Sequence, residues 1–185
     1  MNISTTYVIG KEFSLFIGRQ TAARVLEHCL HSLEHAPPES LVPVSFKNIK
    51  YIDFSAADEF IRKLISRITG KEYHSVYIYL TDTSTLLREN IEAALRLNQQ
   101  VAILWDSPRA PELVGVINHQ LKETWDLVNT RKTLTARGLS DALNIPINTS
   151  SNRLVKLASL GLIHQADRKG ASGGGSEYVY ESLTP

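Results

Sequence analysis

The chain has 185 residues, which is enough for one large domain or two small ones. Its formal net charge of +1 excludes a protein that coats nucleic acid indiscriminately, and its single cysteine, Cys29, excludes an intrachain disulfide. The first residues lack the basic start and apolar core of a signal peptide, and no apolar run approaches the roughly 18–20 residues of a membrane span. We therefore expect a cytoplasmic protein with no membrane partner.

Strands and helices alternate along the first half of the chain. A strand is expected within residues 7–17, and a helix at 18–35 whose apolar stripe includes Cys29. A strand follows at 41–46, a helix over the second half of 51–65, a strand at 75–80, a helix at 84–97 and a covered strand at 101–105. This alternation predicts an α/β domain, a mixed sheet with helices packed over it, over residues 1–106.

This order of elements resembles the STAS fold of anti-sigma-factor antagonists. Over about residues 7–105 the chain is similar to a STAS-like domain family of unknown function, with the signature S-R-x-x-A-x-x-L … D-F-x-x-V … F-A-D-E. The matching positions are Arg19, Ala22, Phe46, Ile49, Ala57, Asp58 and Glu59. Gly18 and Ser45 depart from it, since the family has Ser and Asp there. The resemblance implies an interaction or signal-input domain that binds a protein partner.

Ser55 lies near the loop-to-helix junction where the STAS antagonists carry a phosphorylated serine. A phosphate at this position would meet a helix N-terminus, whose free amides and dipole favour anions. The alternative is that Ser55 only caps the helix, as Asp53 would. Ser55 is therefore a possible phosphoacceptor.

No metal, cofactor or enzymatic site is expected. His28, His31 and His35 share one helix face and would suit zinc or nickel, but one helix rarely supplies three ligands to a single ion, so a solvated polar face is the better interpretation. Asp58 and Glu59 are adjacent on a helix and point about 100° apart, so they do not converge as an acid/base pair. The preference for acids at a helix start explains them instead. No Ser/His/Asp, Walker, Rossmann or HExxH pattern is present.

A separate α+β domain is predicted over the second half of the chain, residues 107–185. Pro108 and Pro111 mark the boundary between the two domains. A long helix is expected from about Pro111 to Val128, and a short helix at 133–143 with Thr135 as its N-cap. After a breaker at 144–146, a helix runs to Gly161, which ends it in a left-handed conformation. Strands at 162–166 and 177–181 follow, joined by a flexible loop that contains 173–175.

The last predicted helix has two different faces. Apolar residues at helical spacing form the expected buried stripe: Ile147, Leu154, Leu157 and Leu160. The opposite face carries short hydrogen-bonding side chains and two cations: Asn148, Thr149, Asn152, Arg153 and Lys156. With Arg168 and Lys169 in the following loop, positive charge gathers where helix and loop would meet phosphates.

From about Glu112 to Leu183 the frame T-x-x-x-L-x-x-x-L … L-x-x-L-x-x-x-G-L-I, followed by a hairpin, resembles the winged-helix DNA-binding family. The resemblance implies that Asn148, Thr149 and Asn152 read base edges in the major groove. Arg153 and Lys156 would contact guanine or phosphate, and Arg168 and Lys169 would anchor the wing on the minor groove or adjacent phosphates.

The sequence thus predicts a transcriptional regulator that binds double-stranded DNA as a homodimer. Its first domain would serve as an interaction or sensing module. The alternative is a protein–protein adaptor in a partner-switching system that does not touch DNA. The near-neutral charge of the whole chain favours that alternative.

Overall fold

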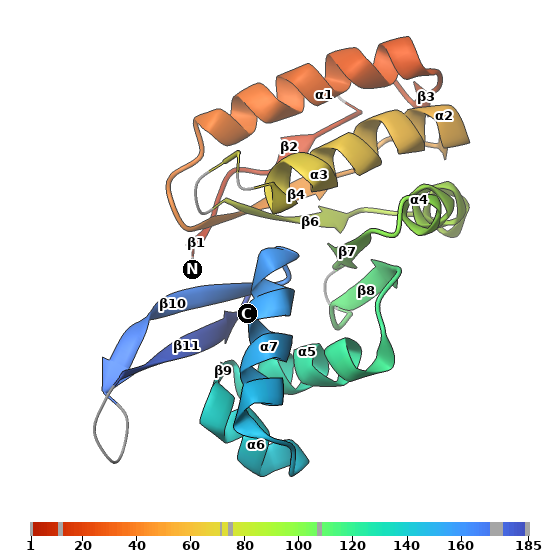
Figure 1. Cartoon of the computed structure of the whole chain (residues 1–185). Coiled ribbons are helices and arrows are strands. Elements are labelled where there is room, and N and C mark those ends of the chain that lie inside the picture. Colours follow the sequence, from red (N-terminus) through yellow and green to blue (C-terminus); the bar gives the residue numbers. More distant parts are fainter. Residues whose placement is uncertain are drawn as a thin grey trace. The chain divides into compact units, whose positions relative to one another are not determined.

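The computed structural model describes residues 2–10, 13–70, 72–73, 76–106, 109–170 and 176–183, with the side chains of residues 2, 167–170 and 176 outside the description. The chain forms two compact units, Met1–Val116 and Ile117–Pro185 (Figure 1). The division falls after Val116 rather than after Asp106, because a strand that follows Asp106 pairs with the sheet of the first unit.

A mixed sheet forms the centre of the first unit. Its strands in the described residues are β1 (Asn2–Ile3), β2 (Tyr7–Val8), β4 (Ser40–Ser45), β6 (Tyr77–Thr81), β7 (Val101–Leu104) and β8 (Glu112–Gly115). Their order is β1-β4-β6-β7-β8, with β2 also paired to β4, and every pair is parallel except β7–β8. Two short strands, β3 (Leu15–Phe16) and β5 (Tyr51–Ile52), pair separately. The α/β class expected from the alternation is confirmed.

Helices pack beside one another in this unit. They are α1 (Arg19–Glu34), α2 (Phe54–Ala57), the π-helical turn η1 (Asp58–Arg62), α3 (Lys63–Thr69) and α4 (Thr85–Leu97). The turn η1 lies between α2 and α3 in the chain and contacts both α1 and α4. On α1 the expected apolar stripe is buried, and Cys29 is a free thiol within it. Burial raises the pKa of this thiol to about 12, so it stays protonated and packs as a small apolar group.

The second unit combines helices with a three-stranded antiparallel sheet. Its elements are α5 (His119–Arg131), β9 (Thr133–Thr135), α6 (Ala136–Leu143), α7 (Ile147–Ser159), β10 (Ile163–Gly170) and β11 (Ser176–Ser182). The sheet order is β10-β11-β9. Trp125 of α5 is buried and donates its indole N–H to the Leu162 carbonyl at 3.2 Å, which ties α5 to the start of β10. No helix among the described residues is long and apolar enough to cross a bilayer.

Two expectations about this half of the chain are wrong. The long helix from about Pro111 to Val128 is replaced by β8 and the later helix α5, which Asn118 caps. Gly115 explains the difference: its φ is 104°, and an added Cβ would lie 2.3 Å from the Gln100 carbonyl oxygen, so the backbone here is neither helical nor open to a side chain. Ile147, expected in the buried stripe of α7, is 47% exposed.

Candidate functional site

The turn between α6 and α7 is fixed by local hydrogen bonds. Thr135 caps α6 by accepting from the Gly138 amide at 3.1 Å, as expected. The helix ends at Asn144, which takes the left-handed conformation with φ 51°. The Ser140 hydroxyl then donates to the Ile145 carbonyl at 2.6 Å. These bonds fix the turn that leads to Pro146, the N-cap residue of α7.

Buried residues on α7 determine which side chains face outward. Leu154 and Leu157 are fully buried, and Ser150 is buried with them. The Ser150 hydroxyl donates to the Pro146 carbonyl at 3.3 Å, which satisfies this polar group inside the protein. On the opposite side Asn148, Asn152 and Lys156 are exposed, and Thr149 is half-buried. The structure therefore brings these four expected site residues onto one outward face.

Arg153 lies apart from this face. Its side chain is only 12% exposed, and its Nη1 lies 3.3 Å from Oε2 of Glu123 on α5. Its Nε is buried and has no hydrogen-bond partner among the described residues. The guanidinium is thus held against α5, and the arrangement does not present it for a contact with guanine.

We expect Arg153→Ala to act on stability rather than on sequence reading. The substitution removes an ion pair and the packing of the Arg stem, so the free energy of unfolding should fall by about 1 kcal/mol. Chemical denaturation measures this loss. Unchanged stability together with lost discrimination at one G·C pair would instead show that Arg153 swings out to read a base.

The β10–β11 hairpin follows α7 directly. Its register shifts between Gln165 and Arg168, which produces a bulge, and pairing resumes up to Gly170 and Ser176. In Figure 1 the two strands extend away from the helices of their own unit. The side chains of Arg168 and Lys169 and the loop 171–175 lie outside the described residues, so the expected cationic anchor of this hairpin remains a prediction.

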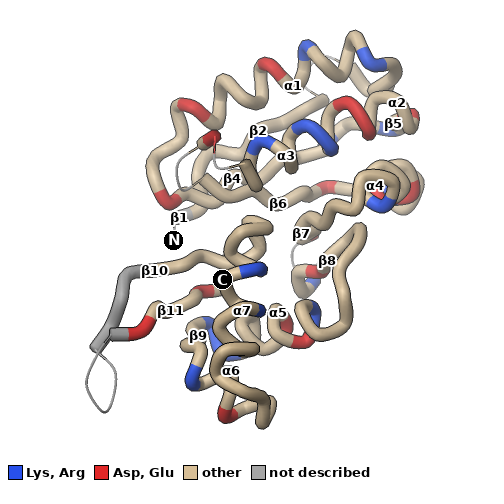
Figure 2. Tube along the Cα trace, in the orientation of Figure 1, with Lys and Arg blue, Asp and Glu red and all other residues tan. Residues whose placement is uncertain are grey.

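Val155 was not anticipated as a surface residue of interest. It is 49% exposed on the same outward face, one turn beyond Asn152. Figure 2 shows Lys and Arg interspersed with Asp and Glu along the described residues of the second unit. The outward face of α7 is accordingly built mostly from neutral side chains.

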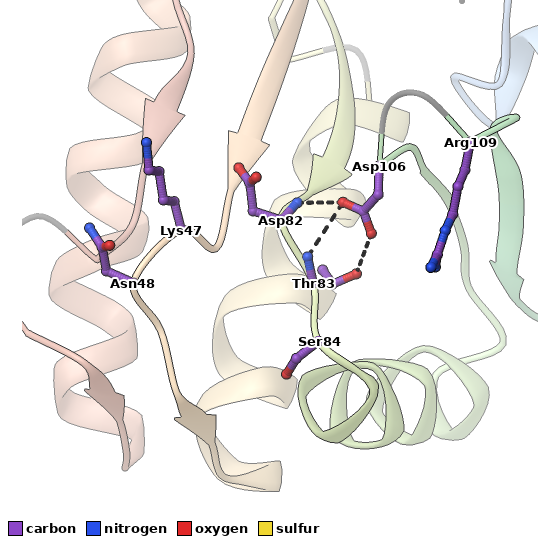
Figure 3. Close-up of a pocket in the computed structure, with 7 residues that line it drawn as sticks. All are labelled: Lys47, Asn48, Asp82, Thr83, Ser84, Asp106 and Arg109. Atoms are coloured by element: carbon purple, nitrogen blue, oxygen red, sulfur yellow. Dashed lines mark hydrogen bonds between the residues drawn. The ribbon is translucent and has the colours of Figure 1, made fainter.

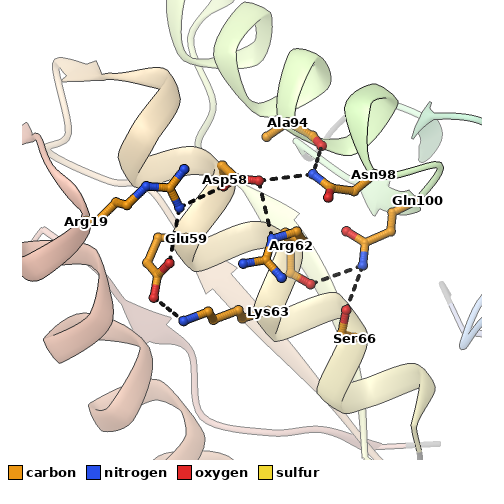
Figure 4. A network of polar contacts seen from close by, with 9 residues as sticks. All are labelled: Arg19, Asp58, Glu59, Arg62, Lys63, Ser66, Ala94, Asn98 and Gln100. Carbon is orange, nitrogen blue, oxygen red and sulfur yellow. Dashed lines mark hydrogen bonds and ion pairs between the residues drawn. The ribbon is translucent and has the colours of Figure 1, made fainter.

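A cluster of ion pairs in the first unit joins three residues of the expected signature (Figure 4). Asp58 and Glu59 of η1 are buried, and both carboxylates reach Nη1 of Arg19, at 2.9 and 3.3 Å. Arg62 and Asn98 also contact Asp58, at 3.3 and 3.0 Å, and Lys63 pairs with Glu59. The explanation from a helix start is wrong for these two acids, because the helix begins at Phe54 and they lie beyond its first turn, in the π-helical turn. There they link α1 to the end of α4.

Both carboxylates are stabilised in their charged form. Burial alone would raise the pKa of Asp58, but hydrogen bonds from Arg19 and Asn98 and the charge of Arg62 hold it below its usual range. The hydrogen bond from Lys63 is the main cause that lowers the pKa of Glu59. The carboxylates are therefore satisfied within the protein and serve to hold helices together.

These shifts predict a loss of stability in acid. A carboxyl group whose pKa is lower in the folded than in the unfolded state stabilises the fold above its unfolded pKa, which is near 4. That contribution disappears as the pH falls through the pKa of the folded state. We expect the free energy of unfolding to decline below about pH 4, and Asp58→Asn to flatten the decline. Glu27→Gln, at an exposed position on α1, is the control that should keep it. An identical acid response in Asp58→Asn would contradict the role of this cluster.

Asp53 is the cap at the Ser55 junction. Its Oδ1 accepts from the Ala56 amide at 2.7 Å, and the same carboxylate accepts from the Gly18 amide. Ser55 itself is half-buried within α2. Because the Asp53 carboxylate already accepts from the Ala56 amide at this helix start, a phosphate on Ser55 would have to compete with Asp53 for that amide. Phosphorylation of Ser55 remains a prediction.

A cavity of about 590 Å³ lies at the carboxyl ends of β4, β6 and β7 (Figure 3). Its lining residues are Lys47, Asn48, Asp82, Thr83, Ser84, Asp106 and Arg109. Ligands of open α/β sheets bind at such edges. Here, however, Asp106 accepts from the amide of Asp82 at 2.5 Å and from the hydroxyl of Thr83 at 3.1 Å, and Asp82 accepts from Ser45 at 2.5 Å. The carboxylates thus hold the loop after β6.

Of the three histidines on α1, the structure brings two together. His31, Glu34 and His35 place one potential ligand atom each within 4.8 Å of one another, and all three side chains are exposed. His35 Nδ1 lies 2.8 Å from the His31 carbonyl oxygen, which leaves its Nε2 outward. These are the described residues that could hold an imidazole-binding metal such as zinc or nickel.

Comparison with known proteins adds no assignment to this geometry. No family model matches the chain, and no curated protein matches it at a significant level.

Proposed function

We propose that the protein is a DNA-binding transcriptional regulator in which the second unit is a winged helix that places α7 in the major groove of duplex DNA. The observation that carries this proposal is the outward polar face of α7, with Asn148, Asn152 and Lys156 exposed after a tight turn. The hairpin that follows at once, and the pairing of β11 with β9, agree with a wing beside such a helix.

The first turn of α7 has a further feature that favours the binding of phosphate groups. No side chain caps this helix, since Pro146 occupies the N-cap position. The first amides of a helix carry partial positive charge and bind phosphate oxygens. In the proposed complex they contact the DNA backbone, Lys156 adds a charged contact, and the cations Arg168 and Lys169 reach phosphates from the wing.

The first unit serves as a STAS-like interaction or sensing module. Its supporting feature is a group of exposed apolar side chains around the β3–β5 pair: Leu15 at 57%, Ile17 at 46%, and Tyr51 and Phe54 at 37% exposure. Leu15 and Tyr51 are register partners, so the group is continuous at that point. Such a group is typical of a surface that binds another protein. A homodimer on a two-fold site is proposed, because one module alone rarely specifies a site.

The same exposed apolar group favours the second candidate, a protein–protein adaptor without DNA contact. Titration of the full chain with random-sequence duplex at two salt concentrations distinguishes the two. In a plot of the logarithm of the association constant against the logarithm of the salt concentration, each neutralised phosphate contributes about −0.9 to the slope. Three phosphate contacts therefore predict that affinity falls roughly 40-fold between about 50 and 200 mM salt. An adaptor predicts no binding at either concentration.

Lys156→Gln tests whether α7 carries part of this electrostatic term. We expect weaker binding to all duplex sequences and a salt slope reduced by about one. Lys50→Gln, an exposed lysine in the first unit, is the matched control and should leave the slope unchanged. Equal slopes in wild type and Lys156→Gln would place the phosphate contacts elsewhere.

A further inference from the structure

The side chains on the outward face of α7 indicate which base pairs this helix would read in duplex DNA. Asn148, Asn152, Val155 and Ser159 follow one another at spacings of four, three and four residues and are all exposed, so they form one ridge along the helix. Ser159 donates its hydroxyl to the Lys156 carbonyl at 2.8 Å and is committed to its own helix. The ridge therefore offers two amides and one branched apolar side chain.

Each of these groups matches one kind of base edge. An Asn amide pairs in a bidentate manner with N6 and N7 of adenine, and an apolar side chain contacts the C5 methyl group of thymine. Guanine is read best by a bidentate Arg or Lys. The arginine of α7, Arg153, is held by Glu123 at 3.3 Å with its side chain 12% exposed. Lys156 is exposed one turn beyond Asn152, and the proposed function assigns it to a phosphate contact.

We propose that this ridge reads A·T base pairs in the major groove, Asn148 and Asn152 through adenine and Val155 through the thymine methyl group. This inference rests on the proposed function and adds the base composition of the site. At a rise of 1.5 Å per residue, the distance from Asn148 to Val155 is about 10 Å, which corresponds to about three base-pair steps. The contacted stretch is accordingly short and consists of A·T pairs.

The experiment begins with selection of bound duplexes from a random library by the full chain. In the selected site each thymine is then replaced in turn by deoxyuridine, which lacks only the C5 methyl group, and each adenine by 7-deazaadenine, which lacks the N7 acceptor. Affinities of wild type, Val155→Ala and Asn152→Ala are measured on every duplex.

For wild type we expect one deoxyuridine position to weaken binding by about three- to five-fold, the effect of one buried methyl group. Val155→Ala should lose the same factor on the natural site and be indifferent to that deoxyuridine, so the two changes are not additive. Asn152→Ala should lose roughly 5- to 150-fold and be indifferent to 7-deazaadenine at one position.

Different results would contradict the reading of A·T pairs and the proposed binding of DNA. Selected sites whose common stretch consists of G·C pairs, or base replacements whose effects simply add to those of the Val155 and Asn152 substitutions, overturn the A·T reading while leaving DNA binding in place. Failure to enrich any duplex, with no salt-dependent binding, overturns the proposed function and the inference together. Denaturation of each variant confirms that the second unit remains folded.

Discussion

Replacing Asn152 by Ala is expected to weaken binding to the selected duplex by roughly 5- to 150-fold, the difference that one good bidentate base contact makes. Asn152 is exposed on α7 and lies between Asn148 and Val155 along the outward ridge. The substitution removes the amide but keeps the helix, because alanine has the higher helix propensity. Equilibrium binding to the selected and to a scrambled duplex measures the effect.

Loss on the selected duplex should exceed loss on the scrambled one, since phosphate contacts are unchanged. Gln20→Ala is the matched control: it removes an amide from an exposed position on α1, in the other unit. It should bind both duplexes as wild type does. Equal affinities of Asn152→Ala and wild type for the selected duplex would remove this side chain from the reading surface.

The largest effect on stability is expected from Leu154→Ala. Leu154 is fully buried between α7 and the rest of the second unit, and large-to-small changes of this kind cost about 2–5 kcal/mol. A unit of this size is stabilised by roughly 3–10 kcal/mol, at about 0.05–0.15 kcal/mol per residue, so the loss is a large fraction of its stability. DNA binding should fall with it, because the outward face of α7 exists only in the folded unit.

Its neighbour provides the control for this experiment. Val155→Ala changes an exposed side chain one position further on and should leave the midpoint of unfolding nearly unchanged. Denaturant unfolding followed by Trp125 fluorescence in a Trp105→Phe background reports on the second unit alone. Similar midpoints for the two variants would contradict the orientation of α7.

Regular periodicity is what made much of the fold predictable. The apolar stripes of α1 and α4 and the covered strands β4 and β7 follow directly from residue spacing. The β8 segment is not predictable from spacing, because Leu113, Val114 and Ile117 are also spaced as a helical stripe. Only the pairing of Val114 with Ala102 and the positive φ of Gly115 settle the conformation, and both depend on β7.

The outward face of α7 was predictable for a similar reason, but its chemistry was not. A helix with buried leucines must expose the opposite side, and Asn148, Asn152 and Lys156 are exposed there. Arg153 lies at the margin of that face, and its position depends on Glu123, thirty residues away on α5. Likewise the π-helical turn that lets Asp58 and Glu59 both reach Arg19 has no signature in residue spacing.

Hydrogen–deuterium exchange of the full chain with and without duplex DNA tests the central claim most directly. If α7 lies in the major groove, bound duplex slows exchange over Ile147–Ser159 and over the β10–β11 hairpin, while α1 and α4 exchange as in the free protein. Slowed exchange confined to the first unit, or no change at saturating duplex, would contradict the assignment of α7 as the DNA-reading helix.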